Sequence, residues 1–192
     1  MAKDFIVAIE LGSSKITGIA GKKNPDGSIT VLSVAKEDSK ACMRKGVVYN
    51  IDKTAQALTN IINKLKGSLQ TDIARVYVGV GGQSLKGVKN VVVKDLPADS
   101  IVTQDIVNEL MDTNRNMKNN DYEVLDAITQ EYKVDMLDEL NPVGVQACHI
   151  EGNFLNLLWR KTFNRSLNKC FDNAGIPIVE MYVTPLAMAE EI

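Results

Sequence analysis

The order of apolar patterns in the first eighty residues restricts the fold more than any other feature of the sequence. Three β-branched or alternating stretches, at residues 4–10, 15–20 and 28–34, are separated by short turns of small residues. A helical pattern at 52–65 and a strand pattern at 75–80 follow. This order predicts a mixed sheet with a crossover helix, because a Rossmann domain would alternate strand and helix from its beginning.

The predicted crossover helix has recognisable ends. Apolar residues recur at helical spacing from Leu58 to Leu65. Asp52 is the expected N-cap, because its carboxylate can accept a hydrogen bond from a free backbone N–H of the first turn. Gly67 is the expected end of the helix.

The charge changes in the second part of the chain. Residues 84–161 contain 8 Lys/Arg and 13 Asp/Glu, a net charge of -5, whereas the remaining residues carry 14 against 11, a net charge of +3. The difference indicates a domain boundary. Inside this block we expect a strand at 88–93, a helix from Thr103, and strands near 123–134 and 143–158.

The last part of the chain returns to helix and strand patterns. We expect a helix at 166–173, a strand at 179–183 and a final helix that Pro185 opens. Because the sequence stops within this last helix, Ile192 is interpreted as a fragment boundary.

Composition excludes several classes of protein. The 192 residues are 45% hydrophobic and carry a net charge of -2, so the chain is globular and lacks the basic stripe of a nucleic-acid partner. No apolar run approaches a membrane span, and the N-terminal residues do not form a signal peptide. The three cysteines are widely spaced, as expected of reduced thiols in the cytoplasm rather than of a metal site. His149, the single histidine, lies in a strand pattern and is not expected to be catalytic.

Two glycine-rich segments of the sequence are candidates for a nucleotide site. Gly82 and Gly87 have the first spacing of a P-loop, but Val88 occupies the position of its lysine, and Gly79–Ser84 lacks the third glycine of the dinucleotide fingerprint. We interpret both as a tight strand end or linker. The N-terminal hairpin is the better candidate. It contains an acid at a strand end, then a glycine, two hydroxyls and a lysine: Glu10, Gly12, Ser13, Ser14 and Lys15.

Such a turn has the groups that a phosphate requires. Small residues let backbone N–H groups and hydroxyls approach the phosphate, and Lys15 adds a positive charge. Glu10 could hold a metal-bound water, since nucleotide-bound Mg²⁺ keeps much of its hydration. The alternative from the residues alone is an ordinary hairpin turn rich in glycine and serine.

These residues carry a resemblance to known proteins. Residues 7–16 resemble the first phosphate motif of the actin-like ATPases, and more specifically the chain resembles the FtsA family of actin-like bacterial cell division proteins. The segments that are similar, in the same order along the chain, are Arg44–Val48, Val76–Gln83, Gln130–Asp135, Asn141–Gly144 and Thr184–Ala187.

The resemblance implies an α/β fold: an actin-like (ribonuclease H-like) mixed sheet with helices and a small inserted α+β subdomain. Residues 1–83 would be the first part of subdomain 1A, and residues 84–161 the inserted, SHS2-like subdomain 1C. Residues 162–192 would return to a truncated subdomain 1A. Glu10 and Ser13 depart from the family's usual Asp and Thr, and the longer acid bears on how Mg²⁺ is held.

The resemblance also implies a function, an ATP-binding scaffold and at most a weak ATPase. The full-length protein would bind ATP and Mg²⁺ through Glu10, Gly12, Ser13, Ser14 and Lys15, whereas this fragment would bind them weakly or not at all. It would polymerise, contact divisome proteins through 1C, and tether FtsZ to the inner membrane at the septum, lying peripherally on its cytoplasmic face. The alternatives are a sugar or acetate kinase of the same superfamily and a pilus-assembly actin-like scaffold.

Overall fold

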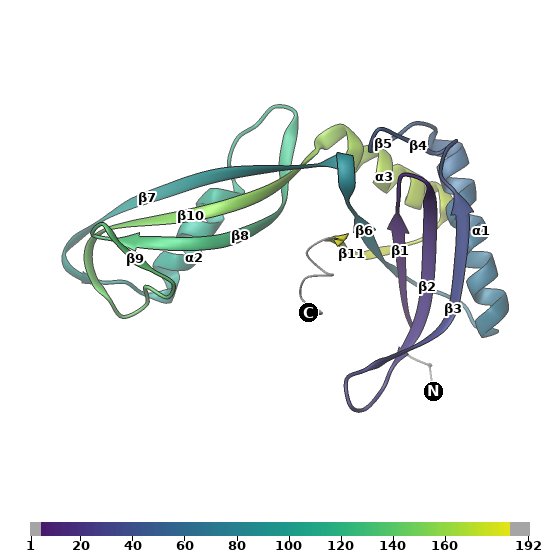
Figure 1. Cartoon of the computed structure of the whole chain (residues 1–192), viewed down its shortest axis with the longest axis horizontal. Helices are drawn as coiled ribbons and strands as arrows, with labels where there is room; N and C mark the ends of the chain where they lie inside the picture. The colour runs from purple at the N-terminus through teal and green to yellow at the C-terminus, as the bar shows by residue number, and fades with distance from the viewer. Residues whose placement is uncertain (1–4, 185–192) are drawn as a thin grey trace. The chain divides into compact units, whose positions relative to one another are not determined.

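A computed structural model describes residues 5–184, which divide into two compact units (Figure 1). Unit 1 runs to Ser84 and resumes at Thr162, and unit 2 comprises Leu85–Lys161. Unit 2 is thus inserted into the sequence of unit 1. Naming the two units as subdomains 1A and 1C stays a prediction. The helix expected from Pro185 lies outside the described residues.

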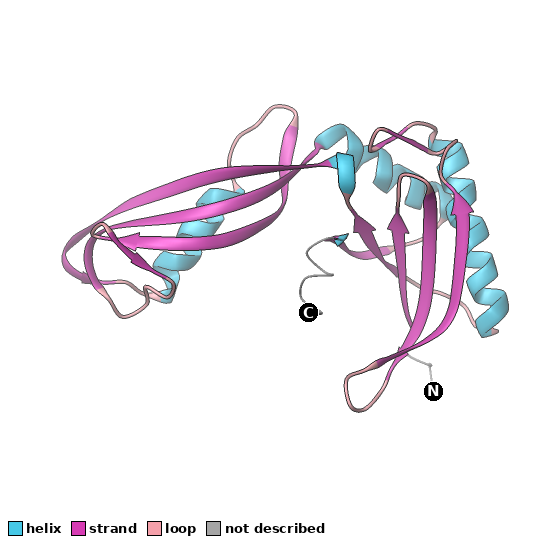
Figure 2. Ribbon diagram, in the orientation of Figure 1, coloured by secondary structure: helices cyan, strands magenta, loops and turns pink. Residues whose placement is uncertain are grey.

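Unit 1 is built on a five-stranded mixed sheet (Figure 2). Its strands are β1 (Phe5–Leu11), β2 (Lys15–Lys23), β3 (Ile29–Asp38), β6 (Val76–Val80) and β11 (Ile178–Val183). In space their order is β11-β6-β1-β2-β3. The pairs β1–β2 and β2–β3 are antiparallel, whereas β6 is parallel to β1 and to β11. The three strands joined by short turns and the strand after the crossover helix, which the sequence predicts, therefore belong to one sheet.

Helix α1 (Ile51–Leu69) packs on strands β2 and β3 through one apolar face. The approach is close at Gly18 of β2, where a Cβ atom would lie 2.3 Å from Cγ2 of Ile61. The N-cap is Asn50, whose side chain accepts from the N–H of Lys53 at 2.9 Å, and not the expected Asp52. The expected end at Gly67 is wrong: Gly67 lies inside the helix, which extends two residues further and is capped by Gln70 in the left-handed conformation, with a φ of 52°.

The remaining elements of unit 1 are short or lie beside α1. Strands β4 (Met43–Arg44) and β5 (Val47–Val48) form a small hairpin before α1. Helix α3 (Lys161–Ala174) buries four residues, among them Cys170, next to Thr54 of α1. Burial raises the pKa of the Cys170 thiol to about 11, so this cysteine stays protonated near neutral pH.

Unit 2 is an antiparallel sheet with one helix. Its strands lie in the order β7-β10-β8-β9, and the helix packs against β7 and β10. The elements are β7 (Leu85–Ile101), α2 (Gln104–Arg115), β8 (Tyr122–Val134), β9 (Leu137–Glu139) and β10 (Gln146–Arg160). Strand β7 is far longer than the segment expected at 88–93, because its polar C-terminal part still pairs with β10. Strand β9 was not expected from the sequence.

The core of unit 2 is apolar between the sheet and α2. Phe154 of β10 is completely buried and meets Tyr132 of β8 edge-to-face, with ring centroids 6.4 Å apart. Outside this core, the ring Nδ1 of His149 lies 2.7 Å from the Asp95 carboxylate, which raises the pKa of the histidine. His149 therefore belongs to a surface ion pair of unit 2.

Two buried asparagines join α2 to the sheet. Asn114 donates to the side-chain oxygen of Asn156 at 2.7 Å, and Asn156 donates back to that of Asn114 at 2.8 Å. Asn90 of β7 donates to the same Asn114 oxygen at 2.9 Å. Because both Asn114 and Asn156 are completely buried, each polar group depends on its protein partner rather than on water.

The substitution Asn156→Ala is expected to lower the free energy of unfolding of unit 2 by about 2–3 kcal/mol, because it leaves the buried Asn114 amide without its carbonyl partner. Urea unfolding followed by the fluorescence of Trp159, the single tryptophan, measures this in unit 2. The control is Asn108→Ala at an exposed position of α2, which should change the value by less than about 0.5 kcal/mol. Equal effects of the two substitutions would contradict the role of the pair.

Candidate functional site

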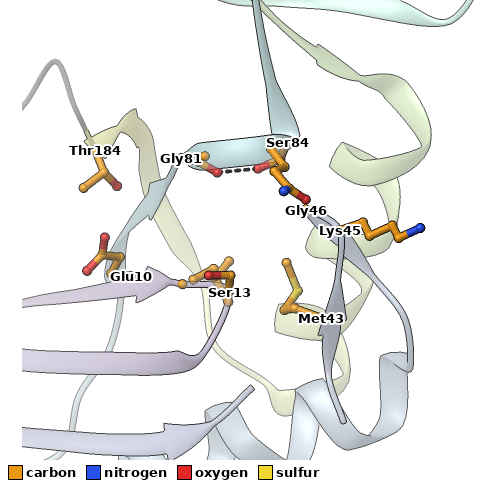
Figure 3. A pocket seen from close by; sticks show the side chains of 12 residues that line it. Glu10, Ser13, Met43, Lys45, Gly46, Gly81, Ser84 and Thr184 are labelled. Carbon is orange, nitrogen blue, oxygen red and sulfur yellow. Dashed lines mark hydrogen bonds between the residues drawn. The ribbon is translucent and has the colours of Figure 1, made fainter. Parts of the chain in front are cut away.

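The carboxyl ends of the three mutually parallel strands, β1, β6 and β11, meet at one edge of the unit 1 sheet. A cavity of about 460 Å³ opens there (Figure 3). Its lining consists of Glu10, Leu11, Gly12, Ser13, Met43, Lys45, Gly46, Gly81, Gly82, Gln83, Ser84 and Thr184. Ligands commonly bind beyond the carboxyl ends of parallel strands, so this cavity is the candidate site.

The predicted hairpin forms one wall of the cavity. The N–H of Gly12 donates to the carbonyl oxygen of Lys15 at 3.0 Å and closes the turn. A Cβ atom on Gly12 would lie 2.6 Å from that oxygen, so glycine is required by the turn itself. Glu10, Gly12 and Ser13 line the cavity, whereas Ser14 and Lys15 are exposed and do not line it.

The hairpin presents unpaired backbone donors. Among residues 5–184, neither the N–H of Ser13 nor that of Ser14 donates a hydrogen bond. The turn is held instead through the carbonyl of Ser14, which accepts from the N–H of Ser39 at 3.1 Å. Exposed N–H groups beside two hydroxyls and a lysine can receive the oxygens of a phosphate.

The second wall comes from the segment after β6. Gly82–Ser84 forms a single 3₁₀ turn, and the Ser84 hydroxyl donates to the carbonyl of Gly81 at 2.8 Å (Figure 3). The tip of the β4–β5 hairpin rests on this turn at Gly46, where a Cβ atom would lie 2.5 Å from the backbone nitrogen of Ser84. The close contact holds the two segments together as one wall.

Glu10 and Thr184 lie side by side at the strand ends, while the side chain of Lys45 extends away from the other labelled side chains (Figure 3). The Oγ1 atom of Thr184 is buried and has no hydrogen-bond partner in residues 5–184. The carboxylate of Glu10, an exposed residue of β1, also has no hydrogen-bond partner within this range. The cavity is therefore lined by one carboxylate and several hydroxyls.

This set of donors and acceptors fits a hydrated magnesium nucleotide. The free N–H groups and hydroxyls of the hairpin suit phosphate oxygens, and a single carboxylate suits an ion that keeps most of its waters. Within residues 5–184 no three His, Cys, Asp or Glu side chains gather to hold a metal directly.

The sequence predicts only the hairpin wall of this cavity. The sequence predicts the hairpin but not Thr184, Gly46 or the wall at Gly81–Ser84, a segment whose pattern indicates only a strand end or linker. The available signal was topological, because strands that run parallel bring their following segments to one edge of the sheet. The sequence did not reveal that β11 would lie beside β6.

Known proteins resemble the chain over nearly its whole length. Residues 82–158 match the family of SHS2 domains inserted in FtsA. The cell division protein FtsA of Porphyromonas gingivalis is 31% identical over 186 residues, which are 95% of this chain and 39% of that protein. FtsA of Neisseria meningitidis is 24% identical over 190 residues, 98% of this chain and 45% of that protein. The chain thus spans less than half the length of these relatives.

A solved structure has the same fold. A chain of the PilM-PilN type IV pilus biogenesis complex matches with a TM-score of 0.61 and 14% identity, over 95% of this chain and 48% of that one. The expected α/β, actin-like fold is confirmed. Among the described residues, no helix has the length and apolarity needed to cross a membrane.

Proposed function

We propose that the chain is part of an actin-like cell division scaffold, because residues 82–158 match the family of SHS2 domains inserted in FtsA and an FtsA protein is 31% identical over 95% of the chain. Unit 1 would contribute one side of an ATP site. The observation that supports this most is the hairpin at the edge of the cavity, with free N–H groups, hydroxyls and a nearby carboxylate.

Each residue of the hairpin has a proposed role toward Mg²⁺·ATP. Gly12 lets the turn close, and the amides and hydroxyls of Ser13 and Ser14 receive phosphate oxygens. Glu10 accepts hydrogen bonds from a water bound to the metal. Lys15 begins β2 directly after the turn, and its long side chain supplies positive charge to the phosphates. The magnesium ion, when bound, neutralises part of the phosphate charge.

The substitution Lys15→Ala in the full-length protein is expected to weaken ATP binding by about ten- to a hundredfold, because a charge-assisted contact contributes roughly 1.5–3 kcal/mol. Lys22→Ala is the matched control on the same strand, also exposed, and should leave the affinity nearly unchanged. Calorimetric titration with ATP gives both affinities, and circular dichroism verifies folding. Identical affinities of the two variants would refute the phosphate role of the hairpin.

The partners follow from the same proposal. The full-length scaffold would form filaments, contact other divisome proteins through unit 2, and hold FtsZ at the cytoplasmic face of the inner membrane. The long sheet of unit 2, with one face free of α2, offers a surface for such contacts.

Copurification with FtsZ is the expected result that separates this scaffold from a pilus-assembly scaffold of the same fold. When the two proteins are co-expressed in a heterologous strain, the tagged full-length protein should retain FtsZ from the same organism. Retention of a pilus-assembly protein without FtsZ would favour the alternative.

A further inference from the structure

One polar group at the cavity has no explanation in the fold. Thr184 Oγ1 is buried and has no hydrogen-bond partner among residues 5–184. Buried polar atoms without a partner are uncommon, and those that persist often serve a ligand or a reaction. Thr184 lies directly after β11 and lines the same cavity as Glu10.

The backbone of Gly79 separates Thr184 from Glu10. Strand β6 runs between β1 and β11, and Gly79 is paired with Glu10 on one side and Tyr182 on the other. A Cβ atom on Gly79 would lie 2.8 Å from Thr184 Oγ1 and 3.9 Å from Glu10 Cγ. Since glycine has no such atom, the two side chains face each other across this strand (Figure 3).

The two groups are chemically complementary. An ionised carboxylate only accepts hydrogen bonds, and a threonine hydroxyl has a proton to donate. Within the described residues the Glu10 carboxylate also has no hydrogen-bond partner. A flexible acidic side chain without a partner loses conformational freedom when it must hold a ligand, and a fixed donor beside it reduces that loss.

We propose that Thr184 is a positioning residue for Glu10. When Mg²⁺·ATP occupies the cavity, the Thr184 hydroxyl donates a hydrogen bond to the Glu10 carboxylate and fixes it toward the metal-bound water. This inference rests on the proposed ATP site. It assigns Thr184 a role through Glu10 and no contact with the nucleotide itself.

Two substitutions at Thr184 separate this role from a structural one. Thr184→Val keeps the size of the side chain but removes the hydroxyl, whereas Thr184→Ser keeps the hydroxyl. In the nucleotide-free chain, Thr184→Val should raise the thermal unfolding midpoint, because it removes an unpaired buried polar group. In the full-length protein the same substitution should weaken Mg²⁺·ATP binding by about tenfold. A purely structural residue would not move stability and affinity in opposite directions.

The matched control is Thr17→Val. Thr17 of β2 is paired with Glu10 on its other side and lines, with Glu10 and Thr184, a second cavity of about 430 Å³, so this variant tests whether any hydroxyl beside Glu10 has the same effect. Neither its unfolding midpoint nor its affinity for Mg²⁺·ATP should change appreciably. A second comparison places Thr184→Val in a Glu10→Ala background, where the loss of the hydroxyl should have no further effect on affinity.

Calorimetric titration of the full-length variants with Mg²⁺·ATP decides the proposal. The proposal is supported if Thr184→Val weakens the affinity for Mg²⁺·ATP and Thr184→Ser keeps it. It also requires that Thr184→Val weaken the affinity no further in a protein that already carries Glu10→Ala. Unchanged affinity in Thr184→Val, or an equal loss in the Glu10→Ala background, would overturn the inference and leave the ATP site standing. If the wild-type protein binds no Mg²⁺·ATP, both this inference and the proposed function fail. Lowered thermal stability in Thr184→Val would also count against it.

Discussion

The substitution Gly46→Ala is expected to lower the free energy of unfolding of unit 1 by about 2–4 kcal/mol. Gly46 has a φ of 72°, a left-handed conformation that alanine adopts only with strain. The added Cβ would also lie 2.5 Å from the backbone nitrogen of Ser84 and 2.6 Å from the carbonyl carbon of Gln83. Backbone atoms cannot rotate away, so the β4–β5 hairpin must leave the 3₁₀ turn.

Gly27→Ala is the matched control for this result. Gly27 also lies in unit 1 and has a φ of 90°, but a Cβ there would meet nothing within 4 Å. Gly27→Ala should lower the free energy of unfolding of unit 1 only by the conformational strain, about 1 kcal/mol. Hydrogen exchange in α1 and β1, measured by mass spectrometry, gives the stability of unit 1 separately from unit 2. Equal losses at Gly46 and Gly27 would mean that the contact with Ser84 contributes nothing.

ATP binding by residues 1–192 is expected to be at least about a thousandfold weaker than ATP binding by the full-length protein. In the proposed site the hairpin would contact the phosphates from one side, and the rest of the full-length protein would supply a base pocket and a second set of phosphate donors. Two lost sets of contacts at roughly 2 kcal/mol each amount to about a thousandfold in affinity. Calorimetry with Mg²⁺·ATP compares the two polypeptides directly.

The comparison needs an internal check that the short chain is folded. Circular dichroism and the fluorescence of Trp159 provide it, since this side chain is buried in unit 2. Micromolar binding of ATP by the folded 192-residue chain would contradict the requirement for an opposing lobe. The Lys15→Ala effect would then be measurable in the short chain as well.

The sequence predicts most individual strands and helices, but not which strands lie next to each other in the sheet. An apolar, β-branched run identified β1, alternating patterns identified β2 and β3, and the helical spacing from Leu58 to Leu65 identified α1, whose apolar face is buried. The N-cap was misplaced by two residues, since Asn50 and Asp52 are equally suitable chemically and only the backbone conformation distinguishes them. Strand β9 has three residues, too few for a period to appear.

The candidate site was predictable only where it is contiguous in sequence. Glu10, Gly12 and Ser13 lie in one hairpin, so their spacing was informative. Thr184 joins them through the parallel pairing of β11 with β6. All of unit 2 and α3 lie between these two strands in the sequence. Single-sequence patterns carry no information about such a pairing, and an unpaired hydroxyl is visible only in three dimensions.

The two ends of unit 2 are held together by its own sheet. Leu85, where β7 begins, is paired with Trp159 near the end of β10. Directly opposed residues in an antiparallel pair have Cα atoms only about 5 Å apart. Once unit 2 is folded, the chain between β6 and β11 therefore behaves kinetically as a short tether plus α3. The loop-closure entropy for bringing β11 to β6 is then set by that tether and not by the length of the insertion.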